Sequence, residues 1–279
     1  MIGRILVALG GTEYTLTAID AAVDLAKRHN AELTGVTVIN VEQLRRIGPV
    51  PLGAGELANE LREERMSLTR EAVEAVVARF EDVCQKAGVK HAVYREEHEE
   101  ACHYLTQLAR YHDLAVVGLH AAFKYSDHDV VGDPQVILDR LVTGGVRPLI
   151  AVTDKPLKVR RALVAFSGSS EAAKTLRSFL LLQPWPDVEV RVITFGRDDL
   201  ENRQLVSDAA EYCRAHGIEP STAVIDGSPN QGILDEAEQW DADIIVMGNS
   251  HKNLLLRRVL GETVLHVIKN SDKALFLGQ

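Results

Sequence analysis

The sequence is poor in cysteine and has no long apolar run. Its three cysteines, Cys84, Cys102 and Cys213, are far apart and form no CxxC pair, so we expect free thiols in a reducing compartment. A membrane-spanning helix needs roughly 20 consecutive apolar residues, and no segment approaches this length. The apolar residues 5–9 are too few for the core of a signal peptide. These absences favour a cytoplasmic protein without a membrane partner.

Basic residues are scarce as well. The chain has a net charge of −9, and neither half has an excess of lysine and arginine. Proteins that bind DNA or RNA need clustered cations to neutralise phosphates, so nucleic acid is not an expected partner. The acidic run 96–100 is expected to be a solvated surface. Hydrophobic residues still make up 46% of the chain and charged residues 25%, which is typical of a soluble globular protein.

What the sequence does contain is an internal repeat. Three segments of the first half match three segments of the second half in the same order: 4–19 with 161–176, 35–39 with 190–194, and 111–120 with 241–250. Such self-similarity is the signature of one structural plan used twice. The predicted join is at Lys155–Pro156, because proline lacks an amide and restricts the residue before it. We therefore predict two domains, residues 1–154 and 155–279.

Each copy alternates short apolar runs with helical patterns. The runs 114–118 and 243–248 do not alternate with polar residues, which indicates strands buried on both faces of a parallel α/β sheet. Helices are predicted from apolar residues three and four apart: Leu16, Ile19, Val23 and Ala26 in one, and Val73, Val76, Phe80 and Val83 in another that ends before Gly88. Ligands of such sheets bind beyond the carboxyl ends of the strands, where the loops at Gly10, Ser167 and Gly248 begin.

The start of each copy, residues 5–13 and 163–171, and the stretch 224–250 resemble the universal stress protein family. The resemblance covers essentially the whole chain as two tandem domains. It implies two flavodoxin-like (adenine nucleotide alpha hydrolase-like) parallel-sheet domains that pair through their last strands. It also implies a cytoplasmic role in the stress response. The apolar terminal runs 148–152 and 274–277 agree with such pairing, because exposed sheet edges this apolar need cover.

Some members of this family bind ATP through a loop with three spaced glycines followed by Ser or Thr, and others do not bind it. Gly248 matches the first glycine and Gly261 the third, with twelve residues between them. His251 replaces the second glycine, and Glu262 stands where ATP binders have the hydroxyl residue. The acidic residue that ends the first strand in ATP binders is Ser167 here. A histidine would fill space that a phosphate needs, and a glutamate would repel a phosphate.

The first copy departs further from the pattern, because its loop between Gly118 and Gly132 is one residue longer and has no middle glycine. Two interpretations of the loop in the second copy stay open. It is either a purely structural strand-loop-helix connection, or it binds a nucleotide (ATP or AMP) or a small anion weakly, since the helix after Gly261 still offers its amides. The candidate nucleotide-binding residues are Ser167, Gly168, Gly248, Asn249, Ser250, His251, Lys252, Gly261, Glu262 and Thr263.

No catalytic residues are predicted, and we expect a non-catalytic regulatory protein without a certain cofactor. Two enzyme alternatives stay open: an ATP-binding member with slow hydrolysis, and an ATP-pyrophosphatase-like enzyme that uses the loop 163–169. The histidines His98 and His103 with Cys102, and the run 127–129, are expected to be polar surface rather than a metal site. The two domains are expected to pair with each other. A homodimer of the whole chain stays open, and the sequence predicts no other protein partner.

Overall fold

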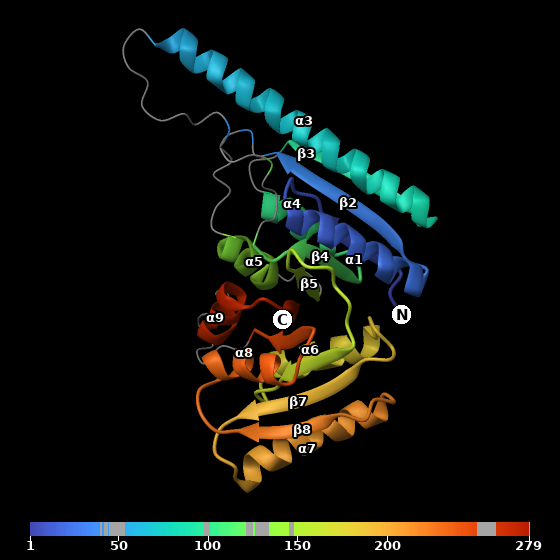
Figure 1. The fold of residues 1–279 in the computed structure, drawn as a ribbon, viewed down its shortest axis with the longest axis vertical. Coiled ribbons are helices and arrows are strands. Elements are labelled where there is room, and N and C mark those ends of the chain that lie inside the picture. The colour runs from blue at the N-terminus through green and yellow to red at the C-terminus, as the bar shows by residue number, and fades with distance from the viewer. Residues whose placement is uncertain are drawn as a thin grey trace.

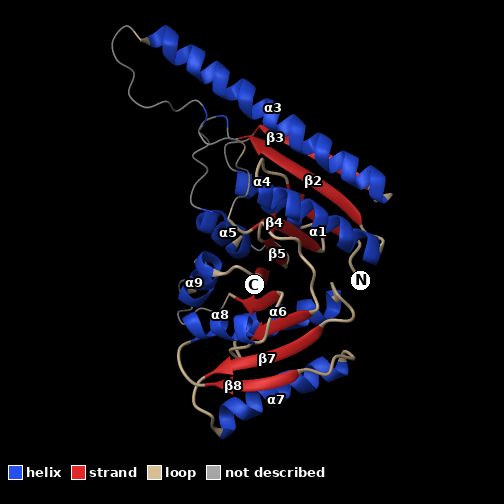
Figure 2. Cartoon of the chain, viewed as in Figure 1, coloured by secondary structure: helices blue, strands red, loops and turns tan. Residues whose placement is uncertain are grey.

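The computed structural model describes residues 1–39, 41, 44, 54–97, 101–120, 125, 134–144, 148–249 and 261–278. Within these residues the strands form one ten-stranded sheet in the order β3-β2-β1-β4-β5-β10-β9-β6-β7-β8. Helices cover the sheet, and the two halves of the chain lie end to end along it (Figures 1 and 2). Each half has the same strand order, read outward from the centre.

The first half contains β1 (Arg4–Ala8), α1 (Glu13–His29), β2 (Glu32–Ile39), α3 (Gly55–Ala87), β3 (His91–Glu97), α4 (Ala101–Ala109), β4 (Leu114–Gly118), α5 (Pro134–Thr143) and β5 (Leu149–Val152). The second half contains β6 (Arg161–Ala165), α6 (Ser170–Leu182), β7 (Glu189–Phe195), α7 (Leu200–Ala215), β8 (Ser221–Ile225), α8 (Pro229–Gln239), β9 (Ile244–Gly248), α9 (Glu262–Asn270) and β10 (Ala274–Gly278).

The two halves meet at their last strands. Within each half every strand pair is parallel, whereas β10 pairs with β5 antiparallel, with Phe276 opposite Ile150. The apolar runs at the ends of the two copies therefore cover each other, and pairing through the last strands is confirmed. The α/β class and the tandem arrangement of two parallel-sheet units are confirmed with it.

Helix α1 shows why the predicted apolar face was partly wrong. Ile19, Val23 and Ala26 are buried as predicted, but Leu16 is 47% exposed. The buried face starts instead at Thr15 and continues through Ala18 and Ala22. Leu16 lies in the first turn of the helix and on the same side as the buried Val23, so its direction around the helix does not account for its exposure. The burial of a threonine cannot be predicted from a pattern of apolar residues.

Two helix ends show a repeat that the sequence comparison missed. Helix α3 ends at Gly88, as predicted, with φ of 67°. The amide of Val89 then donates to the carbonyl of Cys84 at 2.9 Å. In the second half the amide of Ile218 donates to the carbonyl of Cys213 at 3.1 Å. Burial raises the pKa of Cys84 to about 12 and that of Cys213 to about 11, so both stay as inert free thiols.

A carboxylate clamp holds the first strand of each half. The Asp113 carboxylate accepts from the amides of Gly3 at 2.8 Å and Arg4 at 3.0 Å. The Asp243 carboxylate accepts from the amides of residues 160 and 161 at 2.7 and 2.9 Å. Both aspartates immediately precede the fourth strand of their half, β4 or β9. The match of 111–120 with 241–250 is therefore confirmed in three dimensions.

The proposed match between the second strands is off by two positions. Arg4 lies opposite Glu32 in the first half, and Arg161 lies opposite Glu189 in the second half. Glu32 therefore corresponds to Glu189, so residue 35 corresponds to 192 rather than to 190. Side chains alternate between the faces of a strand, and a shift by two keeps the apolar pattern intact. The pattern alone could not detect the error.

No helix in the described part of the chain is both long enough and apolar enough to cross a membrane. The 33-residue helix α3 has the required length, but its surface is mostly polar and charged. It runs along the outer edge of the first half and extends beyond β2 and β3 (Figure 1).

Candidate functional site

In the second half, the loop after β6 forms the cap of a helix. The hydroxyl of Ser169 accepts from the amide of Ala172 at 3.1 Å, and the hydroxyl of Ser167 donates to that of Ser169 at 3.0 Å. Gly168 between the two serines has φ of 74°, which favours glycine. The predicted site residues Ser167 and Gly168 therefore build the start of α6, and the Ser167 hydroxyl already has a partner.

Gly248 lies where the end of β9 crosses the first turn of α6. A Cβ atom added to Gly248 would be 2.5 Å from the carbonyl oxygen of Glu171 and 2.6 Å from the amide nitrogen of Ala172. Both of these atoms belong to backbone and cannot move aside cheaply. Close packing of strand against helix is therefore a sufficient reason for a glycine at this position, with or without a phosphate.

Asn249 closes the loop that the sequence predicted as a phosphate loop. Its side chain is buried, and its Oδ1 accepts from the amide of Gly261 at 3.0 Å. Its own amide donates to the carbonyl of Gly278 at 3.1 Å. The two glycines that flank the loop are thus brought together at the start of α9. Ser250, His251 and Lys252, the three candidate residues inside the loop, lie outside the described residues.

The starts of two helices meet beside this closure. Gly261 is the N-cap of α9, and the hydroxyl of Thr263 donates to Oδ1 of Asn230 at the start of α8, at 2.7 Å. The positive ends of the α8 and α9 dipoles therefore lie close together, which favours an anion. Glu262 is exposed in the first turn of α9 and places a negative charge at the same end.

Of the ten candidate residues, the structure brings together Gly248, Asn249, Gly261 and Thr263 at this closure. Asn230 was not among the candidates. It lies at the start of α8, where Pro229 in the first turn and the Ser228 cap fix the beginning of the helix. The missed signal was spatial, because Asn230 and Thr263 are far apart in the sequence.

The corresponding edge of the first half is built differently. The amide of Gly10 donates to the hydroxyl of Thr15 at 3.1 Å, and Thr12 caps α1 without a side-chain hydrogen bond. The ring of Tyr14 packs edge-on against His120, with centroids 5.8 Å apart. Burial raises the pKa of Tyr14, and the carboxylates of Asp154 and Glu13 raise it further. This edge therefore presents an aromatic pair and nearby carboxylates, where the second half has the serine cap of α6.

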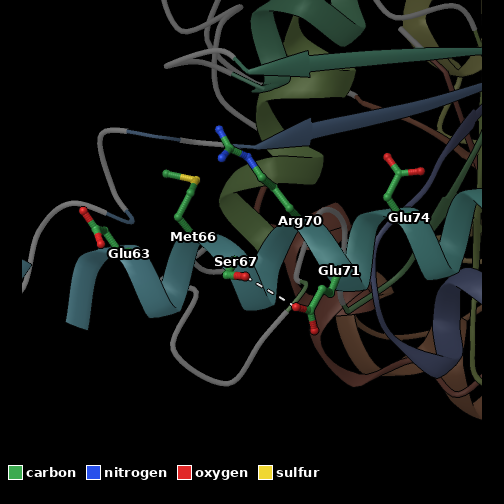
Figure 3. A pocket seen from close by; sticks show the side chains of 6 residues that line it. All are labelled: Glu63, Met66, Ser67, Arg70, Glu71 and Glu74. Atoms are coloured by element: carbon green, nitrogen blue, oxygen red, sulfur yellow. Dashed lines mark hydrogen bonds between the residues drawn. The ribbon is translucent and has the colours of Figure 1, made fainter. Parts of the chain in front are cut away.

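A hollow of about 540 Å³ lies elsewhere, along α3 (Figure 3). Its described lining residues all come from that helix: Glu63, Met66, Ser67, Arg70, Glu71 and Glu74. Arg70 reaches out to Glu97 at 2.9 Å, and Tyr104 donates to the neighbouring Glu96 at 3.0 Å. Part of the acidic run is thus paired rather than only solvated. One face of one helix does not enclose a ligand, so this hollow is not the candidate site.

A metal site is not found in the described part of the chain, where no three His, Cys, Asp or Glu side chains are grouped to hold an ion. His98 and the run 127–129 lie outside the described residues. The side chain of Cys102 is likewise outside them.

The fold and its paired edges define a class, the tandem α/β proteins whose two parallel sheets join through their last strands. The chain matches the model of the Universal stress protein family over residues 1–121 and 192–277, which is more than half of its length. It therefore belongs to this family, as the resemblance in its sequence implied. Among curated proteins, none is significantly similar to the chain in sequence.

Solved structures show the same fold. A universal stress protein from Archaeoglobus fulgidus DSM 4304 is 19% identical, with a TM-score of 0.67, and the match covers 99% of this chain and 98% of that one. A functionally unknown protein from Pseudomonas aeruginosa PAO1 is 14% identical, with a TM-score of 0.57 and coverage of 99% and 92%. At these identities the likeness concerns the fold alone.

Proposed function

We propose that this chain is a non-catalytic, cytoplasmic stress-response protein that binds a nucleotide or a small anion weakly in its second half. The observation that carries the proposal is the hydrogen bond from the Gly261 amide to the Asn249 side chain, at 3.0 Å. It draws the two ends of the glycine-flanked loop together beside the starts of α8 and α9. Amides at a helix start, together with the dipole, favour a phosphate or another anion.

Weak binding follows from the charge at the same place. A carboxylate at Glu262 about 4 Å from a phosphate would cost roughly 1 kcal/mol in water and roughly 4 kcal/mol at an effective dielectric of 20. Ser167 offers no carboxylate to the sugar of a nucleotide. We propose ATP or AMP as the ligand. On the basis of the sequence, we also propose that Ser250, His251 and Lys252 surround it.

The proposed domains are residues 1–154 and 155–279. Strand β5 ends at Val152 and β6 begins at Arg161, so this boundary falls in the connection between the halves. The pairing of β5 with β10 supports the proposal that the two domains pair inside one chain, and that this pairing is part of the regulatory role. A homodimer of the whole chain is a further proposal, which sedimentation at several protein concentrations would test.

The test is a titration of a fluorescent ATP analogue at one salt concentration. We expect the double variant His251→Gly with Glu262→Ser to bind roughly 2–4 kcal/mol more tightly than the unmodified chain, which is about 30- to 1000-fold. Glycine restores backbone freedom and space, and serine replaces a repelling charge by a hydroxyl donor. Glu201→Ser is the matched control, because Glu201 is an exposed first-turn glutamate of α7.

Equal affinities of the unmodified chain and the double variant, or tight binding by the unmodified chain, would contradict the proposed role of the loop. Incubation with ATP separates the alternatives. Formation of AMP and pyrophosphate would favour the pyrophosphatase-like enzyme, and slow formation of ADP would favour the hydrolysing member. We expect neither product above the rate without protein.

A further inference from the structure

One buried tyrosine lies between the ends of two strands in the first half. Tyr125 is 8% exposed, and its hydroxyl donates to the carbonyl of Leu9 at 2.8 Å. The same hydroxyl accepts from the amide of Val38 at 3.1 Å. Leu9 is the first residue after β1, and Val38 is near the end of β2. The phenol therefore bridges the carboxyl ends of the two strands.

The position of this bridge in the sheet is well defined. The amide of Leu9 donates to the carbonyl of Val36 at 2.8 Å, which is the last direct bond between the two strands. In a parallel pair the next bond would join the Val38 amide to the Leu9 carbonyl. The strands separate there, and the Tyr125 hydroxyl occupies the gap. It satisfies a buried donor and a buried acceptor that would otherwise each cost free energy.

The second half contains the same opening without such a side chain. The amide of Phe166 donates to the carbonyl of Ile193 at 2.8 Å, which corresponds to the bond between Leu9 and Val36. The next pair would be the Phe195 amide and the Phe166 carbonyl. In the part of the chain that the structure describes, no side chain bonds to these two groups. Both phenylalanines are partly exposed, whereas Leu9 and Val38 are buried.

An adjacent amide and carbonyl at this edge select a particular chemistry. They recognise a group that donates and accepts hydrogen bonds at neighbouring atoms, such as an amide, the edge of a nitrogen heterocycle or a hydroxyl. The edge is also where ligands of doubly wound sheets bind. A phenol hydroxyl meets both requirements with one atom, and while it is bonded to both backbone groups no ligand can bond to them.

We propose that Tyr125 is an internal ligand of the first half, which occupies the position of an incoming ligand and confines binding to the second half. This inference rests on the proposed function, since it explains which of two similar edges remains open. A tyrosine that only anchored its own segment would leave the number of ligand sites unchanged when removed.

The experiment counts bound nucleotides on the full-length chain by native mass spectrometry and by titration with the fluorescent ATP analogue. We expect Tyr125→Ala to raise the stoichiometry from one nucleotide per chain to two. Tyr111→Ala is the matched control, because Tyr111 is 72% exposed and its removal should leave the stoichiometry at one. An unchanged stoichiometry in folded Tyr125→Ala, judged by circular dichroism, would overturn the proposal.

A second variant assigns the new site to one half. Asn249→Ala removes the acceptor of the Gly261 amide and should abolish binding in the second half. The combined variant Tyr125→Ala with Asn249→Ala should then keep one nucleotide, whereas Asn249→Ala alone should bind none. A chain that binds none unmodified but one as Tyr125→Ala would defeat the proposed function and uphold the inference. One bound nucleotide in both the unmodified chain and Tyr125→Ala would uphold the proposed function and defeat the inference.

Tyr125→Phe keeps the test open if the alanine variant does not fold. Phenylalanine preserves the packing of the ring but releases both backbone groups. We expect hydrogen exchange at the Val38 amide to become roughly fivefold faster or more, as after the loss of one hydrogen bond. Added nucleotide should slow this exchange in Tyr125→Phe and leave it unchanged in the parent chain. Nucleotide without effect on the variant would overturn the inference.

Discussion

The two halves of the molecule agree in their framework and differ at their carboxyl edges. Each half has an aspartate clamp, Asp113 or Asp243, and a cysteine-glycine helix end. At the edge, the first half places the Tyr125 hydroxyl between two strands, whereas the second half joins the starts of α8 and α9 through Asn230. Contacts that hold a sheet together are thus repeated, and contacts that would meet a ligand are not.

The largest effect is expected at the packing glycine of the second half. Gly248→Ala places a Cβ atom against the backbone of Glu171 and Ala172, so β9 and α6 must move apart. We expect a loss of about 1–3 kcal/mol in the free energy of unfolding, measured with urea. Gly55→Ala is the control, because a Cβ there meets nothing within 4 Å. A loss below about 0.5 kcal/mol for Gly248→Ala would contradict the packing role.

A smaller effect, equal in both halves, is expected at the aspartate clamps. Asp113→Ala and Asp243→Ala each remove an acceptor from two consecutive backbone amides. Each substitution should lower the free energy of unfolding, measured with urea, by about 1–2 kcal/mol. The loss stays this small because water can hydrogen-bond to part of the exposed amides. Asp272→Ala, which removes an exposed ion pair to Lys155, should change stability by less than about 0.5 kcal/mol. Losses that differ between the clamps by more than that would break their equivalence.

The smallest effect on stability is expected at acidic pH, and it should arise from the first half alone. His112 is buried, with one ring nitrogen 2.7 Å from the Leu108 carbonyl and the other 2.8 Å from the Thr34 hydroxyl. Burial lowers the pKa of His112, and Arg4 lowers it further, against the raising effects of the Leu108 carbonyl, Asp113 and Glu32. The repeat places Ala242 at the corresponding position of the second half.

Because the folded chain keeps His112 neutral, the unfolded chain binds its proton first as the pH falls below about 6.5. The stabilising effect of a neutral His112 is therefore complete above this pH and is lost below it. We expect the free energy of unfolding to fall between pH 7 and 5.5, by at most about 1.4 kcal/mol per pH unit for this group. His112→Ala should flatten this slope, whereas His103→Ala, at an exposed site on α4, should keep it. An unchanged slope in His112→Ala would rule out this group as the cause.

Much of the fold could be predicted because its signals are local. The runs 114–118 and 243–248 had to be strands covered on both faces, and Gly88 had to end a helix. The candidate site was harder to predict from the sequence. Gly248 and Gly261 were recognised from their spacing, but the sequence could not distinguish a glycine that admits a phosphate from one that admits the backbone of α6. The exposure of Leu16 and the burial of Thr15 were likewise not visible in the pattern of apolar residues.

Local composition and spacing account for the α/β class, the tandem repeat and the join of the last strands, because apolar runs and their order do not depend on distant residues. Three features depend on contacts between distant segments: the shift of two positions between the second strands, the bond from Asn230 to Thr263, and the Tyr125 bridge from Leu9 to Val38. Each of them depends on groups whose relative positions are set by the packed sheet. Sequence spacing carries no information about that geometry until the chain has folded.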